Sequence, residues 1–82
     1  MTLFNATIHS IGREIFAGKV QALTLPGIQG EFQVLAEHAP LISKLKEGDI
    51  KVLKEDGSMQ TLPIAGGVIE VTPNEASVLV DF

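Results

Sequence analysis

The chain has 82 residues, a formal net charge of −4 and 45% hydrophobic residues, a composition typical of a single soluble globular domain over residues 1–82. The acidic balance argues against nucleic acid as a partner, and the absence of cysteine excludes disulfides and thiolate metal sites. No segment approaches the roughly 18 continuous apolar residues that span a bilayer, and the opening MTLFNATIHS does not have the pattern of a signal peptide.

Alternating apolar and polar residues predict a strand at the start of the chain. Phe4, Ala6 and Ile8 alternate with polar residues, so that one face of this segment can be buried. The next apolar run, VQALTL at residues 20–25, is apolar on both parities. A small two-sheet domain has one core, so we expect some of this apolar surface to face outward and contact a partner.

Residues 39–48, APLISKLKEG, fit two interpretations. Leu41 and Leu45 are four residues apart, Pro40 stands where a helix begins and Gly48 where one ends. A strand is favoured because Leu41 and Ile42 are consecutive apolar residues and every neighbouring segment has a β-like pattern.

The second half of the chain predicts two hairpins. Asp56-Gly57 lies between two β-like runs in residues 49–64, and this dipeptide tolerates a type I′ turn. Pro63 predicts an edge position, since proline cannot donate to a sheet ladder. Gly66-Gly67 indicates close backbone approach, and Pro73-Asn74 predicts a turn. The last run alternates Ala76, Val78, Val80 and Phe82 on one face.

These patterns predict an all-β fold, a flattened β-sandwich or barrel of two antiparallel sheets with about ten short strands. Regularly spaced turn residues, 8 Gly and 4 Pro in all, support this prediction. No motif indicates a cofactor or a phosphate-binding loop.

Residues 30–42, GEFQVLAEHAPLI, place charged groups inside an apolar run. One hypothesis is a small metal-dependent β-barrel enzyme that uses His38, Glu37 and His9. Another is a free-standing ligand-binding sandwich with a deep apolar pocket. The third is a surface that another protein contacts, since no nucleophile or spaced metal-ligand pair accompanies His38.

The whole chain resembles the epsilon subunit of rotary F-type ATP synthases. The segment VQALTLPGIQGEFQVLAEHAPLISKLKEGDIKVL at residues 20–53 carries the resemblance most specifically, through Gly30-Glu31 and the run His38-Ala39-Pro40-Leu41. HSIGREIFAGKV at residues 9–20 and AGGVIEVTPNEASVLVDF at residues 65–82 also fit the family pattern.

The chain departs from the family pattern at three places. Gln33 stands where glycine is usual, and Ala36-Glu37 where proline and a small residue are common. The family's C-terminal pair of helices, which can inhibit ATP hydrolysis, has no counterpart in these 82 residues, so its functions are not carried over.

The resemblance implies a non-catalytic rotor subunit that links the gamma subunit to the membrane c-ring. It implies a peripheral location on the cytoplasmic face of the bacterial inner membrane, without direct insertion. It also implies which residues contact each partner. On the c-ring side we expect Glu31, Phe32, His38, Ala39, Pro40 and Leu41, and on the gamma side Ser10 and Ile42.

Overall fold

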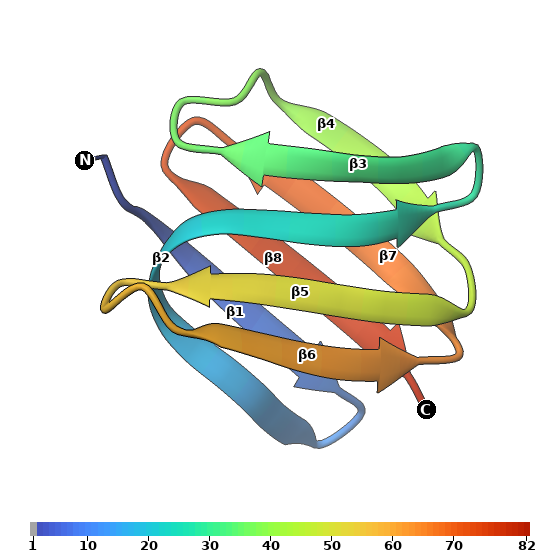
Figure 1. Cartoon of the computed structure of the whole chain (residues 1–82). Helices are drawn as coiled ribbons and strands as arrows, with labels where there is room; N and C mark the ends of the chain where they lie inside the picture. Colours follow the sequence, from blue (N-terminus) through green and yellow to red (C-terminus); the bar gives the residue numbers. More distant parts are fainter. Residues whose placement is uncertain (1) are drawn as a thin grey trace.

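Eight β-strands form the described part of the chain, residues 2–82 of a computed structural model, and no helix occurs in that range (Figure 1). In chain order they are β1 (Phe4–Ser10), β2 (Arg13–Gly27), β3 (Gly30–Leu35), β4 (Leu41–Leu45), β5 (Gly48–Lys54), β6 (Met59–Ile64), β7 (Gly66–Thr72) and β8 (Glu75–Asp81).

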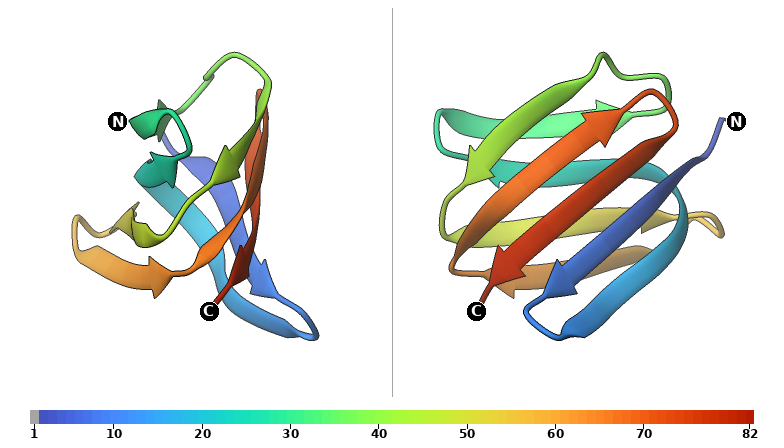
Figure 2. Two further views of the ribbon diagram at one scale, coloured as in Figure 1. Left: turned by 90° about the vertical axis from the view of Figure 1, so that its right-hand side faces the viewer. Right: turned by 180° about the vertical axis from the view of Figure 1, so that it is seen from behind.

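The strands form two facing layers that share the long strand β2 (Figure 2). In the first layer β3, β2, β5 and β6 lie side by side, and in the second β4, β7, β8 and β1 do. The first half of β2 pairs with β1, and its second half pairs with β3 and β5. The result is a ring-like sandwich that does not close into a barrel.

A β-bulge at Gln21 explains how one strand serves both layers. Val20 pairs with Lys54 and Ala22 pairs with Leu53, so Gln21 is an extra residue without a partner in the register. A bulge bends its strand and increases the local twist, which lets a strand pass from one sheet to another. The Gln21 side chain donates a 3.3 Å hydrogen bond to the carbonyl oxygen of Glu55.

The bulge also explains the apolar run at residues 20–25. Inserting one residue reverses which parity faces inward, so apolar residues on both sides of Gln21 are buried. The expectation of outward apolar surface in this run was therefore wrong for Val20, Ala22, Leu23 and Leu25. Outside this run, Leu35 and Met59 are large, apolar and exposed.

The core lies between the two layers and is built from alternate residues of every strand. The predicted inward residues of β1, β5 and β8 are buried, except Phe82. Phe82 lies beyond the end of β8, at Asp81, and is 65% exposed. Sixteen buried residues form one cluster: Phe4, Ala6, Ile8, Val20, Leu23, Leu25, Val34, Leu45, Ile50, Val52, Ile64, Ile69, Val71, Ala76, Val78 and Val80.

The hairpin predicted around Asp56-Gly57 is confirmed, but its loop has four residues between Lys54 and Met59. A type I′ turn needs positive φ at both central residues, and here only Gly57 has it, at 89°. The Asp56 carboxylate instead accepts hydrogen bonds from the Ser58 hydroxyl at 2.6 Å and the Ser58 N–H at 2.8 Å. These bonds, the hydroxyl one first, lower the pKa of Asp56 below its usual range.

The other turn predictions also hold. Thr72 pairs with Glu75 across Pro73-Asn74, which makes a tight turn between β7 and β8. Pro63 lies on β6, which pairs only with β5 and is therefore an edge strand. Gly67 meets β8 so closely that a Cβ placed on it would overlap the carbonyl oxygen of Leu79.

The structure corrects two features of the predicted fold, the number of strands and the purely antiparallel sheets, and settles whether residues 41–45 form a helix or a strand. There are eight strands in place of about ten, and β2 is one continuous strand of 15 residues. The sheets are not wholly antiparallel, since β1 and β8 pair in parallel. Residues Leu41–Leu45 form a strand, as favoured, and not a helix. No helix in residues 2–82 has the length and apolar character to cross a membrane.

Candidate functional site: an open groove between β3 and β4

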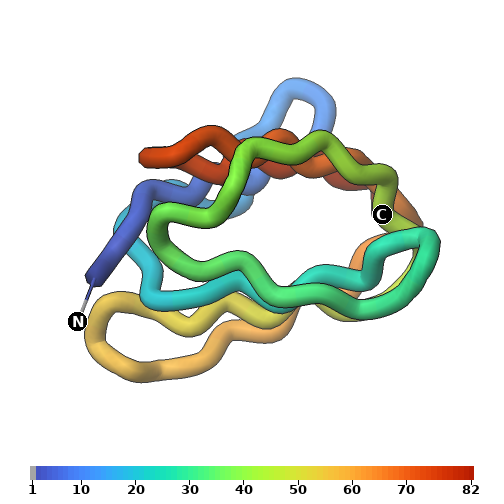
Figure 3. The backbone as a smooth tube through the Cα atoms, turned by 90° about the horizontal axis from the view of Figure 1, so that it is seen from above, coloured from blue at the N-terminus to red at the C-terminus, as the bar shows by residue number. Residues whose placement is uncertain are grey.

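Residues of β3 and β4 line an open groove. The two strands lie at one edge of the sandwich (Figure 3). β3 is paired on one side to β2, and β4 is paired on one side to β7, so the two strands do not pair with each other. The β3–β4 groove has a volume of about 710 Å³. It is lined by Gly27, Ile28, Gln29, Gly30, Glu31, Phe32, Gln33, His38, Leu41, Ile42, Ser43 and Lys44.

The groove is closed at one end by main-chain hydrogen bonds between β2 and β4. The Ile28 N–H donates to the Lys44 carbonyl oxygen at 3.1 Å, and the Lys46 N–H donates to the Pro26 carbonyl oxygen at 2.9 Å. At the other end the loop of residues 36–40 joins β3 to β4. The groove is thus fixed at both ends by the chain itself, which keeps its shape defined.

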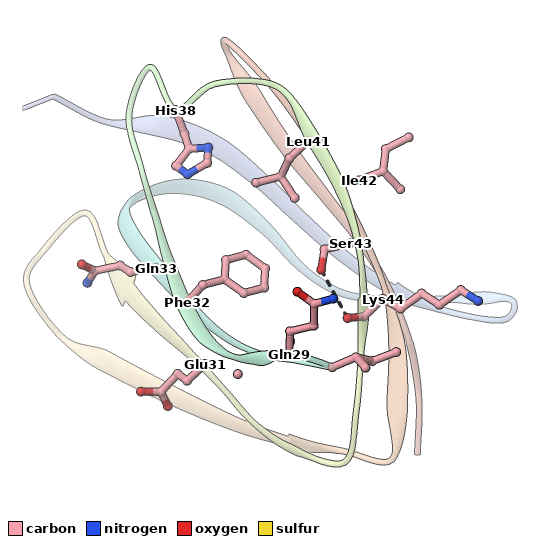
Figure 4. Close-up of a pocket in the computed structure, with 12 residues that line it drawn as sticks. Gln29, Glu31, Phe32, Gln33, His38, Leu41, Ile42, Ser43 and Lys44 are labelled. Carbon is pink, nitrogen blue, oxygen red and sulfur yellow. Dashed lines mark hydrogen bonds between the residues drawn. The ribbon is translucent and has the colours of Figure 1, made fainter.

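The side chains that line the groove differ in direction (Figure 4). Phe32 and Leu41 point into it, are half-buried and pack against the core. Glu31 and Ile42 point away from it on opposite sides, and both are exposed. The groove therefore presents an apolar floor between two rims that carry exposed side chains.

The loop that joins the two strands contains a constrained turn. The His38 N–H donates to the Leu35 carbonyl oxygen at 3.3 Å, which closes a four-residue turn, and Glu37 has φ of 62°. A positive φ at the third residue alone is the signature of a type II turn, which favours proline second and glycine third. The departure of Ala36-Glu37 from the family pattern thus keeps the turn but fills it with less suited residues.

The ring of His38 is held in one orientation by its own loop. Its Nδ1 lies 2.7 Å from the carbonyl oxygen of Ala39. A carbonyl oxygen only accepts, so Nδ1 carries the hydrogen, and in the neutral ring Nε2 is then a free acceptor. His38 lines the groove and is half-buried, so Nε2 is available to a donor from a bound partner.

Most of the residues expected on the c-ring side are brought together. Glu31, Phe32, His38 and Leu41 all line the β3–β4 groove. Ala39 and Pro40 are exposed in the adjoining loop. Glu31 and His38 do not line a closed internal cavity, as a buried metal site would require, but belong to an open surface.

The two residues expected on the gamma side are separated. Ser10 ends β1, whereas Ile42 lies on β4 and is 73% exposed. Within their layer the order is β1-β8-β7-β4, so two strands lie between them. Ile42 also borders the groove, which connects the two predicted surfaces.

Sequence reasoning did not identify several residues of the groove, among them Gln29, Ser43 and Lys44. Which edges of β3 and β4 remain unpaired is determined by long-range pairing, and no local sequence pattern indicates it. Gly27 ends β2 and also lines the groove. A Cβ at Gly27 would lie 2.8 Å from the Phe32 ring, so this glycine leaves room for that ring at the groove floor.

The metal-dependent enzyme hypothesis needs His9, Glu37 and His38 in one cluster. Within residues 2–82 the structure contains no group of three or more His, Asp or Glu side chains placed to hold a metal ion. His9 pairs with Glu14 near the end of β1, and the other two residues lie in the loop between β3 and β4. The structure does not bring the three residues together.

Replacing Glu37 with glycine should raise the free energy of unfolding by about 0.5–1 kcal/mol. Glycine adopts positive φ without the steric cost that a side chain imposes, and this gain exceeds the added freedom of the unfolded chain. Thermal and urea unfolding measure the change. The matched control is Ala36→Gly, one residue earlier, where φ is not positive and glycine should destabilise. Destabilisation by both substitutions would contradict the assigned turn.

Comparisons with known proteins agree on one family. Residues 3–82 match the family described as ATP synthase, Delta/Epsilon chain, beta-sandwich domain. An ATP synthase epsilon chain from Bordetella petrii is 38% identical over 81 residues, which is 99% of this chain and 57% of that protein. This chain therefore spans little more than half the length of that relative.

Two solved structures have the same fold. A chain in the structure of Euglena gracilis mitochondrial ATP synthase, OSCP/F1/c-ring in rotational state 1, superimposes with a TM-score of 0.90 and 25% identity. The match covers 95% of this chain and 50% of that one. A chain of the Tetrahymena thermophila mitochondrial ATP synthase central stalk and c-ring gives a TM-score of 0.79 at 12% identity, over 96% and 63% of the two chains.

The family match over residues 3–82, together with the Bordetella petrii relative, shows that this chain belongs to the β-sandwich family of ATP synthase delta and epsilon chains.

Proposed function

We propose that this chain is a non-catalytic component of the central stalk of an F-type ATP synthase. In this role it links the gamma subunit to the c-ring, so that ion-driven rotation of the ring is coupled to ATP synthesis elsewhere in the complex. The observation that carries the proposal is the family match over nearly the whole chain. The relatives named above belong to ATP synthases, one of them in a central-stalk and c-ring assembly.

The β3–β4 groove supports a contact role for this end of the molecule. Glu31 and His38 both line this open groove, and Phe32 and Leu41 point into it as an apolar floor. We assign the c-ring contact to Glu31, Phe32, His38, Ala39, Pro40 and Leu41. Exposed carboxylates at an interface fix how the two partners align and raise their association rate more than they raise affinity. A subunit that couples two others needs such a defined alignment.

The sandwich itself suits a part that must transmit torque. Its two layers share one 15-residue strand and enclose a single cluster of buried residues. Such cores are packed as densely as organic crystals, so they resist deformation. As part of the complex the chain would be peripheral to the membrane, on the cytoplasmic face of the bacterial inner membrane, with no segment inserted and no cofactor of its own.

The direct test is binding to the gamma subunit of the same organism. Purified chain and gamma subunit should co-elute as a one-to-one complex in size-exclusion chromatography, and calorimetry should give a dissociation constant. A folded chain that shows no binding to gamma would overturn the proposal. Folding is established separately by circular dichroism, so that a failed interaction is not confused with an unfolded sample.

A further inference from the structure

The Asp56-Gly57 dipeptide lies in the loop between β5 and β6, outside the site described above (Figure 1). Residues 55–58 are all exposed, and a Cβ built on Gly57 would meet no atom within 4 Å. Water therefore has free access to the dipeptide. An aspartate followed by glycine is the arrangement in which an aspartyl side chain reacts most readily with its own main chain, because glycine has no side chain to hinder the approach.

The reaction is an isomerisation that starts with ring closure. The Gly57 nitrogen forms a bond to the side-chain carboxyl carbon of Asp56, and the amide hydrogen and the carboxyl hydroxyl leave together as one water molecule. The five-membered imide that results takes up one water molecule again at either of its carbonyl carbons. Opening at the main-chain carbonyl leaves the chain running through the Asp56 side chain, as isoaspartate, with no net change in mass.

The structure holds the Asp56 carboxyl in its unreactive form. One carboxylate oxygen accepts hydrogen bonds from the Ser58 hydroxyl at 2.6 Å and the Ser58 N–H at 2.8 Å. Hydrogen bonds to a carboxylate favour its ionised form. Ring closure needs the protonated carboxyl, since the ionised group has no hydroxyl to release. Both bonds therefore oppose the first step of the isomerisation.

The attacking nitrogen is restrained by the same loop. The Gly57 N–H donates to the Lys54 carbonyl oxygen at 3.0 Å, which disfavours the loss of its hydrogen. The Lys54 N–H in turn donates to the Ser58 carbonyl oxygen at 2.8 Å. The Gln21 side chain donates to the carbonyl oxygen of Glu55 at 3.3 Å. Ring closure moves the Gly57 nitrogen out of this arrangement, so it must break hydrogen bonds that the loop makes.

We propose that Asp56-Gly57 is a latent site of isoaspartate formation, and that Ser58 is the residue that keeps it unreacted in the folded chain. Ser58 donates both of the bonds to the carboxylate described above, one from its side chain and one from its main chain. Such protection belongs to the β5–β6 hairpin alone and does not depend on the proposed function.

Peptide mapping after incubation at neutral pH tests the proposal, because aspartyl and isoaspartyl peptides of equal mass separate by liquid chromatography. The chain unfolded in urea should isomerise at least about tenfold faster than the folded chain, since it lacks the hydrogen bonds of the loop. Ser58→Ala should raise the rate of the folded chain at least about threefold, since it loses one hydrogen bond to an ionised group. Ser58→Thr keeps the hydroxyl and should stay near the wild-type rate.

Two controls separate this role from a general effect on stability. Ser77→Ala makes the same change on β8, in the other layer, and should leave the rate of the folded chain unchanged. In urea, Ser58→Ala and the wild type should isomerise equally fast, because neither has the loop's hydrogen bonds. Circular dichroism before incubation establishes that each variant is folded.

A wild-type rate for folded Ser58→Ala would overturn the proposal, as would equal acceleration by Ser77→Ala. Acceleration by Ser58→Ala to the same extent in urea would also overturn it, because the effect would then come from the local sequence and not from the folded loop. Should Ser58→Ala fail to fold, the wild type alone decides: the proposal fails if the folded chain isomerises within about threefold of the rate in urea.

Discussion

Replacing Gly67 with alanine is expected to lower the free energy of unfolding by about 3 kcal/mol, near the upper end for overpacked sites. Gly67 pairs with Val80 on β8, and an added Cβ would overlap the Leu79 carbonyl oxygen and lie 3.1 Å from the Cα of Val80. These contacts are main-chain atoms in a paired strand. They cannot rotate away as the tip of a flexible side chain could, so β7 and β8 must separate locally.

The preceding glycine provides the control for this substitution. A Cβ on Gly66 would have the Leu45 carbonyl oxygen at 3.5 Å as its nearest neighbour, an ordinary van der Waals contact. Gly66→Ala should therefore change stability by less than about 1 kcal/mol, in either direction. Urea unfolding of both variants measures the difference. Equal losses for the two would show that the close approach of β7 and β8 is not specific to Gly67.

Local sequence pattern was sufficient to predict strands that bury one face and the short turns that join them. β1, β5 and β8 follow period-2 alternation, and the sequence-based prediction of their inward residues fails only at Phe82. Phe82 continues the alternation but follows Asp81, the last paired residue of β8, and periodicity in one segment does not indicate where the pairing ends. The β3–β4 groove could not be predicted from local pattern either, because it depends on which strands pair with each other.

Long-range pairing decided what local pattern left open. The parallel pair of β1 and β8 joins residues about 70 positions apart, and the turns along the chain predict only antiparallel neighbours. The bulge at Gln21 is a second case, because an apolar run on both parities fits either exposed surface or a reversed register. Only the partners Lys54 and Leu53 distinguish the two.

Resemblance and geometry contributed differently to the site. The family motif selected Glu31 and His38, and the structure places both along one groove. The motif could not indicate that Nδ1 of His38 is occupied by the Ala39 carbonyl, or that the free edge of β4 borders the same groove. Both features depend on where main-chain groups lie in space, which a side-chain motif does not specify.

Replacing Glu31 with lysine should weaken binding to the c-ring at least about tenfold, because a reversed charge at an interface removes a favourable contact and adds a repulsive one. Glu31 is exposed and points away from the core, so the variant should fold and unfold like the wild type. Binding to purified c-ring, measured by surface plasmon resonance at two ionic strengths, gives the effect, which should shrink at higher salt.

Two further variants separate the position of the charge from its sign. Glu55→Lys makes the same charge change in the exposed loop between β5 and β6, away from the groove, and should leave c-ring binding within about twofold of wild type. Glu31→Gln removes the charge but keeps an amide able to bond, so its loss should be intermediate. If Glu31→Lys and Glu55→Lys behaved alike, only net charge would matter, and the assignment of Glu31 to a specific contact would be wrong. If Glu31→Lys lost its fold, Glu31 would have a structural role that its exposure does not suggest, since removing an exposed charge rarely changes stability by more than about 0.5 kcal/mol.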